Sequence, residues 1–268
     1  MKKLFTIAAL FIAYTSAAQN IQNAVSLINE AQTEPNDSLR TEIANAAVNM
    51  FESVISADQD LTATYDDIKP VTMLTSADNR LRIFTWGIQF SDGTFTYYGF
   101  AQSRSDDGDV ITTRLIDMSD STPDAAGVSM QPDNWYGAIY YELVQVGGKK
   151  SHLYAVAGWD GADLFVNRKV LEQIRVKSDG SIYFGGYFSD EHNQSFDRLI
   201  FEFTERAVMS LRYDPKMKMF IADHMTVPAQ YNGNTKFAGP DGSFDGYMFT
   251  KGGTWMYVPD LDIKGSRF

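Results

Sequence analysis

The segment 198–225, RLIFEFTERAVMSLRYDPKMKMFIADHM, decides the fold class because its apolar residues alternate along the chain. Its first strand places three apolar side chains on one face: Leu199, Phe201 and Phe203. A period of two is typical of a half-buried strand. The Asp214–Pro215 step predicts a turn, since proline presets the backbone that a turn requires. The segment therefore predicts antiparallel strands with one face in a core and the other in water.

The stretch upstream of this segment, from Trp135 to Tyr187, repeats the same pattern of apolar runs and turns. Its predicted turns are glycine-rich, and glycine permits the positive φ that tight hairpins need: Gly147–Lys150, Gly158–Gly161 and Ser178–Gly180. Short connections favour strands that are neighbours in sequence, so we predict a meander. In a meander the first and third of these turns lie at one end and the second at the other.

Further strands are expected on both sides of this region. Hairpin signals separate them at Ser91–Gly93 and Lys251–Gly253, and Val110–Ile116 reads as a strand of its own. A long polar loop spans Asp117–Asn134. Three of the four tryptophans fall within strand patterns and are expected in the core: Trp86, Trp135 and Trp255.

Residues 1–18 have the charged start, apolar middle and small-residue end of a secretory signal peptide, with cleavage expected after Ala18. The apolar run is shorter than the roughly 20 residues that a bilayer span needs. We therefore expect an exported protein, periplasmic or extracellular, with no membrane insertion after cleavage.

Residues 19–57 predict a helical hairpin. Pro35 ends the first helix, and Asn36, Asp37 and Ser38 offer N-cap side chains for the second. The apolar positions of the second helix recur at helical spacing: Leu39, Ile43, Ala47, Met50 and Val54.

The fold prediction is α+β, with the helical hairpin packed on a large antiparallel β body formed by residues 58–268. The β body is expected to be a sandwich or barrel. A propeller is a minor alternative, because the similar turns at Ser91, Ser178 and Asp241 are unequally spaced.

The net charge and the cysteine content of the chain reduce the number of partners and chemistries that we expect. The chain has 23 Lys and Arg against 34 Asp and Glu, and without Lys2 and Lys3 the balance of 21 against 34 gives a net charge of −13. Nucleic acid is therefore not an expected partner, because such binding rests on clustered basic residues. The chain has no cysteine, which excludes disulfides and thiolate chemistry.

No nucleophile or phosphate-loop motif is present, so we expect no cofactor. No metal site is expected either, because His152, His192 and His224 lack metal-ligand spacing. Calcium at the aspartates near Gly108 and Gly242 is an alternative, although Asp beside Gly is also typical of a hairpin tip.

The candidate ligand-binding residues are Trp159, Asp160 and Asp163. An indole at a turn between glycines can stack on a sugar or peptide while the carboxylates accept hydrogen bonds. If Trp159 is exposed, Trp159→Ala should cost little stability and weaken binding sharply.

Two classes of function fit. The first is a non-catalytic binding or structural module whose ligand is a glycan or a peptide. The alternative is a glycan hydrolase, which needs two carboxyl groups facing each other across a cleft. Its candidates lie on predicted strands: Glu142, Glu202 and Glu205. Two of them within about 10 Å at the floor of an aromatic cleft would favour the hydrolase.

The C-terminal segments GPDGSFDGY (239–247) and GTWMYV (253–258), followed by Asp260-Leu261-Asp262, resemble the carboxyl end of a group of uncharacterised exported bacterial proteins. The resemblance covers the C-terminal half. It implies export and a β-rich body, and no activity, cofactor or partner.

Overall fold

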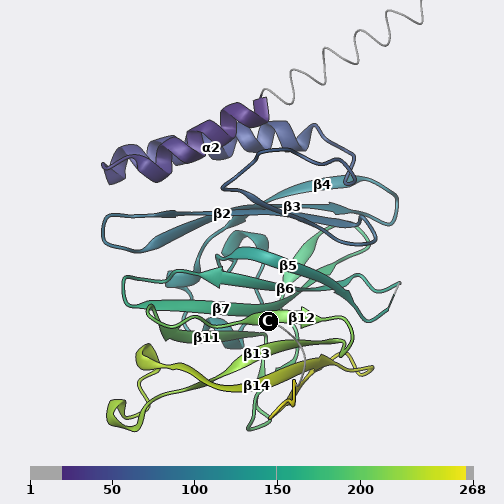
Figure 1. Ribbon diagram of the computed structural model, residues 1–268. Coiled ribbons are helices and arrows are strands. Elements are labelled where there is room, and N and C mark those ends of the chain that lie inside the picture. Colours follow the sequence, from purple (N-terminus) through teal and green to yellow (C-terminus); the bar gives the residue numbers. More distant parts are fainter. Residues whose placement is uncertain (1–19, 149, 264–268) are drawn as a thin grey trace, which may run out of the picture.

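The structure, a computed structural model, describes residues 20–148 and 150–263 and stacks them in layers, with the helices on top and three sheets below (Figure 1). Three hydrophobic cores fill the spaces between successive layers. The predicted α+β class is confirmed. The predicted signal peptide lies outside the described residues.

The helical layer consists of helix 20–33 and α2 (Asp37–Ser56). Asn36 caps α2 as predicted, and its side-chain oxygen accepts a hydrogen bond from the amide of Leu39 at 3.1 Å. The apolar face expected for α2 is partly wrong, because Leu39 and Met50 are exposed.

The buried face of α2 is centred on Phe51. This ring packs against three aromatic residues of the sheet below: Phe84, Trp86 and Phe100. An aromatic ring buries more apolar area than Met or Leu, so it sets which side of the helix faces the sheet.

The first sheet has the order β1-β2-β3-β4 and lies under the helices. Its strands are β1 (Thr72–Thr75), β2 (Leu81–Gln89), β3 (Phe95–Arg104) and β4 (Val110–Ile116). The predicted bounds of β4 and the predicted turn between β2 and β3 are confirmed.

The middle sheet has the order β11-β7-β6-β5, and β8 extends it by pairing with β7. Its strands are β5 (Ile139–Val146), β6 (Leu153–Asp160), β7 (Val166–Val176), β8 (Ile182–Phe184) and β11 (Arg198–Thr204). The predicted meander is confirmed for β5, β6 and β7.

The third sheet has the order β10-β9-β15-β14-β13-β12. Its strands are β9 (Phe188–Ser189), β10 (Ser195–Phe196), β12 (Leu211–Asp214), β13 (Met219–Thr226), β14 (Gly239–Phe249) and β15 (Trp255–Val258). The turn predicted at Asp214–Pro215 joins β12 to β13.

Both faces of the middle sheet are covered. Val170 packs in the core shared with the first sheet, and its neighbour Leu171 packs in the core shared with the third sheet. The prediction that one face of segment 198–205 meets water is therefore partly wrong: Leu199 points to the third sheet and Arg198 on the other face is fully buried, while Glu202 and Thr204 on that face are partly exposed. Neighbouring strand residues point to opposite faces, so a sandwiched sheet buries both sets.

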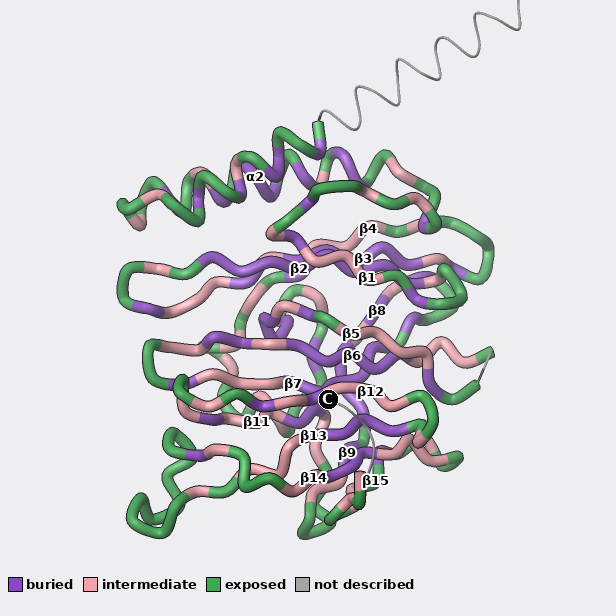
Figure 2. Tube along the Cα trace, in the orientation of Figure 1, coloured by how far each residue is buried: buried purple, intermediate pink, exposed green. Residues whose placement is uncertain are grey.

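Figure 2 shows buried backbone running through the inner strands and exposed backbone gathered in the connections. The three tryptophans expected in the core are all fully buried: Trp86, Trp135 and Trp255. The β body that we expected as a sandwich or barrel consists of three stacked sheets: the chain enters the third sheet at β9 and β10, returns to the middle sheet as β11, and enters the third sheet again at β12.

A buried ion pair joins β11 to β7. Arg198 and Glu172 are register partners, both side chains are 0% exposed, and Arg198 Nε donates to Glu172 Oε2 at 3.0 Å. Glu172 also accepts from the Tyr140 hydroxyl, and Arg198 also donates to the carbonyls of Ala125 and Val128. The pair therefore ties three strands to the loop between β4 and β5.

Replacing one member of this pair should be strongly destabilising. Arg198→Met leaves Glu172 charged and buried, and the free energy of unfolding should fall by about 3 to 5 kcal/mol. The double variant Glu172→Leu/Arg198→Met should recover part of that loss, since no unpaired charge remains. Urea denaturation measures both. The control is Arg206→Ala, whose side chain is 88% exposed. An Arg198→Met protein as stable as this control would contradict the prediction.

Candidate functional site

Asp160 is a buried hydrogen-bond acceptor at the end of β6. Its carboxylate accepts from the hydroxyls of Tyr97 at 3.0 Å and Tyr136 at 2.9 Å, and from the amide of Ala162 at 2.8 Å. Arg168 donates to it at 3.2 Å. Asp160 therefore anchors the β6–β7 connection from inside the protein, and its oxygens are engaged there.

Trp159 lies within β6, where it pairs with Lys169 of β7 and Ile139 of β5. The turn predicted at Gly158–Gly161 begins later than expected, because the strand continues through Asp160. The indole is half-buried and packs edge-on against Phe95, with ring centroids 5.3 Å apart. Trp159 therefore supports the end of the strand and is less open than the sequence suggested.

Asp163 shapes the loop that follows. Its Oδ1 accepts from the amides of Phe165 at 2.7 Å and Val166 at 3.0 Å. This turn presents two large apolar side chains to solvent, Leu164 and Phe165, the latter 70% exposed. Solvent exposure of a phenylalanine to this degree is typical of a binding surface when other aromatic rings lie nearby.

A ladder of charged residues fixes a second loop beside the first. Arg168 lies between Asp160 and Glu202 and donates to both, at 3.2 and 3.1 Å. Glu202 also accepts from the Thr235 hydroxyl at 2.7 Å. Thr235 belongs to the β13–β14 connection, which projects from the third sheet in Figure 1, so the ladder holds this connection against the edge of the middle sheet.

A cleft of about 590 Å³ opens between the two loops and the end of β11. We call it the aromatic cleft, and its lining residues are Phe165, Thr204, Glu205, Arg206, Tyr231, Lys236 and Phe237. Tyr231 and Phe237 stack in parallel, with centroids 4.0 Å apart and planes within 8°. The rings are 38% and 43% exposed. Part of each of these residues is therefore accessible to solvent at the cleft.

Sequence reasoning missed the rings of the aromatic cleft. The signal that singled out Trp159, an aromatic residue in a turn, is also present at Tyr231 and Phe237 in the turn-rich segment 228–242. Of the predicted residues, Asp160 and Asp163 support the two loops from behind. Phe165 follows Asp163 closely in sequence, so the predicted residues and the aromatic cleft share the β6–β7 connection.

The carboxylates expected for a hydrolase are spread over the middle sheet. Glu142 lies on β5 and Glu202 on β11, which are its opposite edges. Three strand spacings of about 4.8 Å separate the two strands that carry these residues. Glu205 follows β11 and pairs with Arg206 at 3.3 Å. Burial raises the pKa of Glu142, whose carboxylate accepts from the Tyr213 amide. This spread does not provide a facing acid and base.

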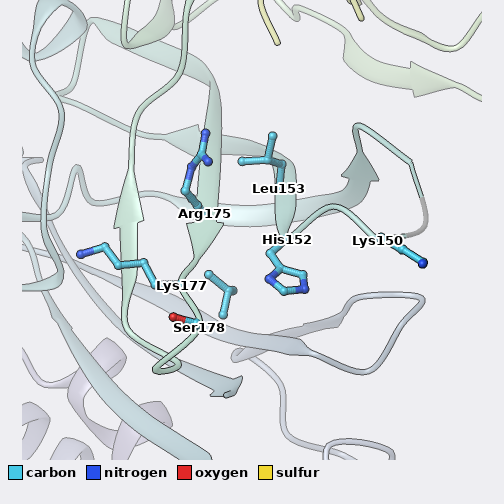
Figure 3. Close-up of a pocket in the computed structure, with 7 residues that line it drawn as sticks. Lys150, His152, Leu153, Arg175, Lys177 and Ser178 are labelled. Atoms are coloured by element: carbon cyan, nitrogen blue, oxygen red, sulfur yellow. The ribbon is translucent and has the colours of Figure 1, made fainter. Parts of the chain in front are cut away.

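A second hollow, of about 420 Å³, lies at the other end of the middle sheet and is rimmed by Lys150, His152, Arg175 and Lys177. Lys150 and Ser178 both line it, so the first and third predicted turns share one end, as expected. In Figure 3, Lys150 and Lys177 point in opposite directions, and Arg175 and His152 extend to opposite sides of the strands. The cationic groups do not converge on one ion.

His224 forms an ion pair with Asp245 in the third sheet. It lies at a β-bulge between β13 and β14, and its Nδ1 is 2.6 Å from Asp245 Oδ2. The hydrogen bond to Asp245 raises the pKa of His224, and the charge of Asp241 adds to the effect. The pair stabilises the base of the β13–β14 connection, which carries Tyr231 and Phe237.

In the described residues, no group of three or more His, Asp or Glu side chains is placed to hold a metal ion. Asp241, a calcium candidate, accepts from the amide and hydroxyl of Ser243 in a turn. No helix within residues 20–148 and 150–263 has the length and apolarity needed to cross a membrane. No protein-family model, curated protein or solved structure matches the chain.

The His224–Asp245 pair predicts a pH dependence of stability. A folded-state pKa above 6.5 means that protonation favours the folded state, so the contribution is complete below pH 6.5 and is lost as the pH rises through the folded-state value. His224→Gln should therefore lower the free energy of unfolding at pH 6, by about 1 kcal/mol or less for a pair near the surface. The difference should shrink by pH 9.

Urea denaturation at both pH values measures this effect. His192→Gln is the matched control, because His192 is exposed and its contact with Glu191, at 3.6 Å, is longer than that of His224 with Asp245. A loss for His224→Gln that is the same at both pH values would show that packing, and not charge, accounts for the role of His224.

Proposed function

We propose that this protein is an exported, non-catalytic binding module that holds a glycan chain in the aromatic cleft. The observation that carries the proposal is the parallel pair of exposed rings, Tyr231 and Phe237, facing a cleft that Phe165 also lines. Flat aromatic faces bind the apolar faces of sugar rings, and a few polar groups beside them orient the ligand. Export is supported by the signal-peptide pattern of residues 1–18.

The cleft is held in place before a ligand arrives. The Thr235 hydroxyl donates to Glu202, and Asn234 Oδ1 accepts from the Lys236 amide at 3.1 Å. On the other side, the Glu205 amide donates to the Phe165 carbonyl at 2.9 Å. A preorganised site loses less conformational entropy on binding, so rings on such loops bind more tightly than rings on free loops.

The backbone around the cleft favours a glycan over an extended peptide. A peptide that adds to a sheet edge needs free amides and carbonyls on that edge. At the end of β11 the Thr204 amide already donates to Ala238, and the Glu205 amide donates to Phe165. The exposed features that remain are aromatic faces and polar side chains, which suit a sugar.

The positions of the three candidate glutamates do not support the alternative of a glycan hydrolase. Glu205 lines the cleft, and Glu202 is close to it in sequence. The Glu202 carboxylate accepts hydrogen bonds from Arg168 and Thr235. Glu142 lies at the opposite sheet edge. A glycosidase needs an acid and a base on either side of one bond, and these positions do not provide it.

Removing one ring of the stacked pair should abolish most of the binding. Phe237→Ala should weaken glycan binding at least about tenfold, because covering a phenylalanine side chain contributes about 1.5 to 3 kcal/mol. Stability should fall only by about 0.5 to 1.5 kcal/mol, since the ring is partly exposed. A glycan array identifies ligands, and titration calorimetry with the tightest ligand compares the variants.

The matched control is Val208→Ala, which shortens an apolar side chain that is 86% exposed and is not among the residues lining the cleft. If Phe237→Ala binds the glycan as tightly as Val208→Ala does, the aromatic cleft is not the binding site. If Trp159→Ala weakens binding and Phe237→Ala does not, the site lies at the end of β6. If a peptide array gives signals and the glycan array gives none, the ligand is a peptide.

A further inference from the structure

We infer that the glycan is acidic, and that Lys236 and Arg206 bind carboxylates on its sugar rings beside the Tyr231–Phe237 pair. This inference rests on the proposed function and specifies its ligand as a uronic-acid-containing oligosaccharide. The evidence is the charge of the aromatic cleft, which is opposite in sign to that of the whole chain.

The lining of the cleft carries two cations and one anion: Lys236, Arg206 and Glu205. The whole chain has a net charge of −11. The cationic excess of this lining is opposite in sign to the net charge of the chain, as it is at the second hollow, which Lys150, Arg175 and Lys177 rim. Clustered charge of one sign at a concave site favours a ligand of the other sign.

The Lys236 ammonium has no ion-pair or hydrogen-bond partner within the described part of the chain, although its backbone amide is held by Asn234. Lys236 also directly precedes Phe237, so an ammonium group and a stacking ring come from one short 3-10 turn, Thr235–Phe237. A sugar ring on Phe237 would place its substituents beside this ammonium group.

Arg206 provides the second cation. It contacts Glu205 through Nε at 3.3 Å, and within the described residues its two terminal nitrogens have no partner. A guanidinium fork suits the two oxygens of a carboxylate. Because Arg206 follows β11 and Lys236 lies in the β13–β14 connection, they can contact carboxylates on successive sugar units.

The desolvation of these cations decides between neutral and acidic glycans. A neutral sugar that covers Lys236 removes water from an ammonium group and returns only hydroxyl contacts, which is unfavourable. A uronate supplies a compensating charge at the same place. The distant carboxylates of the protein oppose an acidic ligand weakly, because salt screens charges separated by more than about 8 Å at physiological ionic strength.

The experiment compares oligogalacturonate and oligoglucuronate with their methyl esters, which keep the rings and remove the charge. We expect the acids to bind the full protein more tightly than the esters, by about two- to fivefold for each contacting cation. Lys236→Gln and Arg206→Gln should each remove one such factor for the acids and leave the esters unchanged. Phe237→Ala should weaken acids and esters alike.

Lys216→Gln is the matched control, because it removes the same charge at the exposed β12–β13 turn. Equal binding of acids and esters, or equal effects of Lys216→Gln and Lys236→Gln, would overturn the acidic preference and leave glycan binding intact. If no glycan on the array binds, the proposed function itself fails. Binding of neutral glycans alone also overturns the inference, since the cations then contribute nothing.

Discussion

The ion pair between Glu172 and Arg198 is the interaction on which the layered architecture depends. Both charges lie in a sheet that is covered on both faces, so neither can reach water. The desolvation cost of such a pair is offset best when its remaining hydrogen-bonding positions are also filled. Tyr140 fills one position on Glu172, and the carbonyls of Ala125 and Val128 accept from Nη1 of Arg198, whereas Nη2 has no hydrogen-bond partner among the described residues. The register of β7 and β11 and the path of the long loop are thus set together.

The same two strands extend from this pair to the surface, where their ends form the base of the aromatic cleft. On the way, the buried carboxylate of Asp160 is linked through Arg168 to Glu202, and from there to Thr235. Asp160, Arg168 and Glu202 are cross-strand neighbours that the sheet already places close by, whereas Thr235 lies in a 3-10 turn of the β13–β14 connection. A rigid core therefore positions loops that come from two different sheets. Binding residues are often carried on loops in this way, because a rigid scaffold limits the entropy lost on binding.

The charge of the residues that line the aromatic cleft is opposite in sign to the net charge of the whole chain. The acidic excess repels other acidic molecules over long distances, but this effect is screened by salt. In the binding role that we propose, the lining of the cleft selects the ligand at short range. Lys236 and Arg206 line that cleft next to aromatic rings, so apolar contact would supply affinity and charge would supply selectivity. The net charge of the chain therefore does not predict the charge of this lining.

Local patterns in the sequence determined the strands, the turns and the α+β class, because side-chain alternation and turn chemistry depend on near neighbours. The bounds of β4, the cap at Asn36 and the three core tryptophans follow from such patterns.

The stacking of three sheets was decided only in the tertiary structure. The sequence of a strand that is buried on both faces, such as β7, does not indicate which other sheets cover those faces. The buried face of α2 depended on the aromatic residues that Phe51 meets. The aromatic cleft joins residues from β11, the β6–β7 loop and the β13–β14 connection, which are brought together by sheet packing and by the Arg168 ladder.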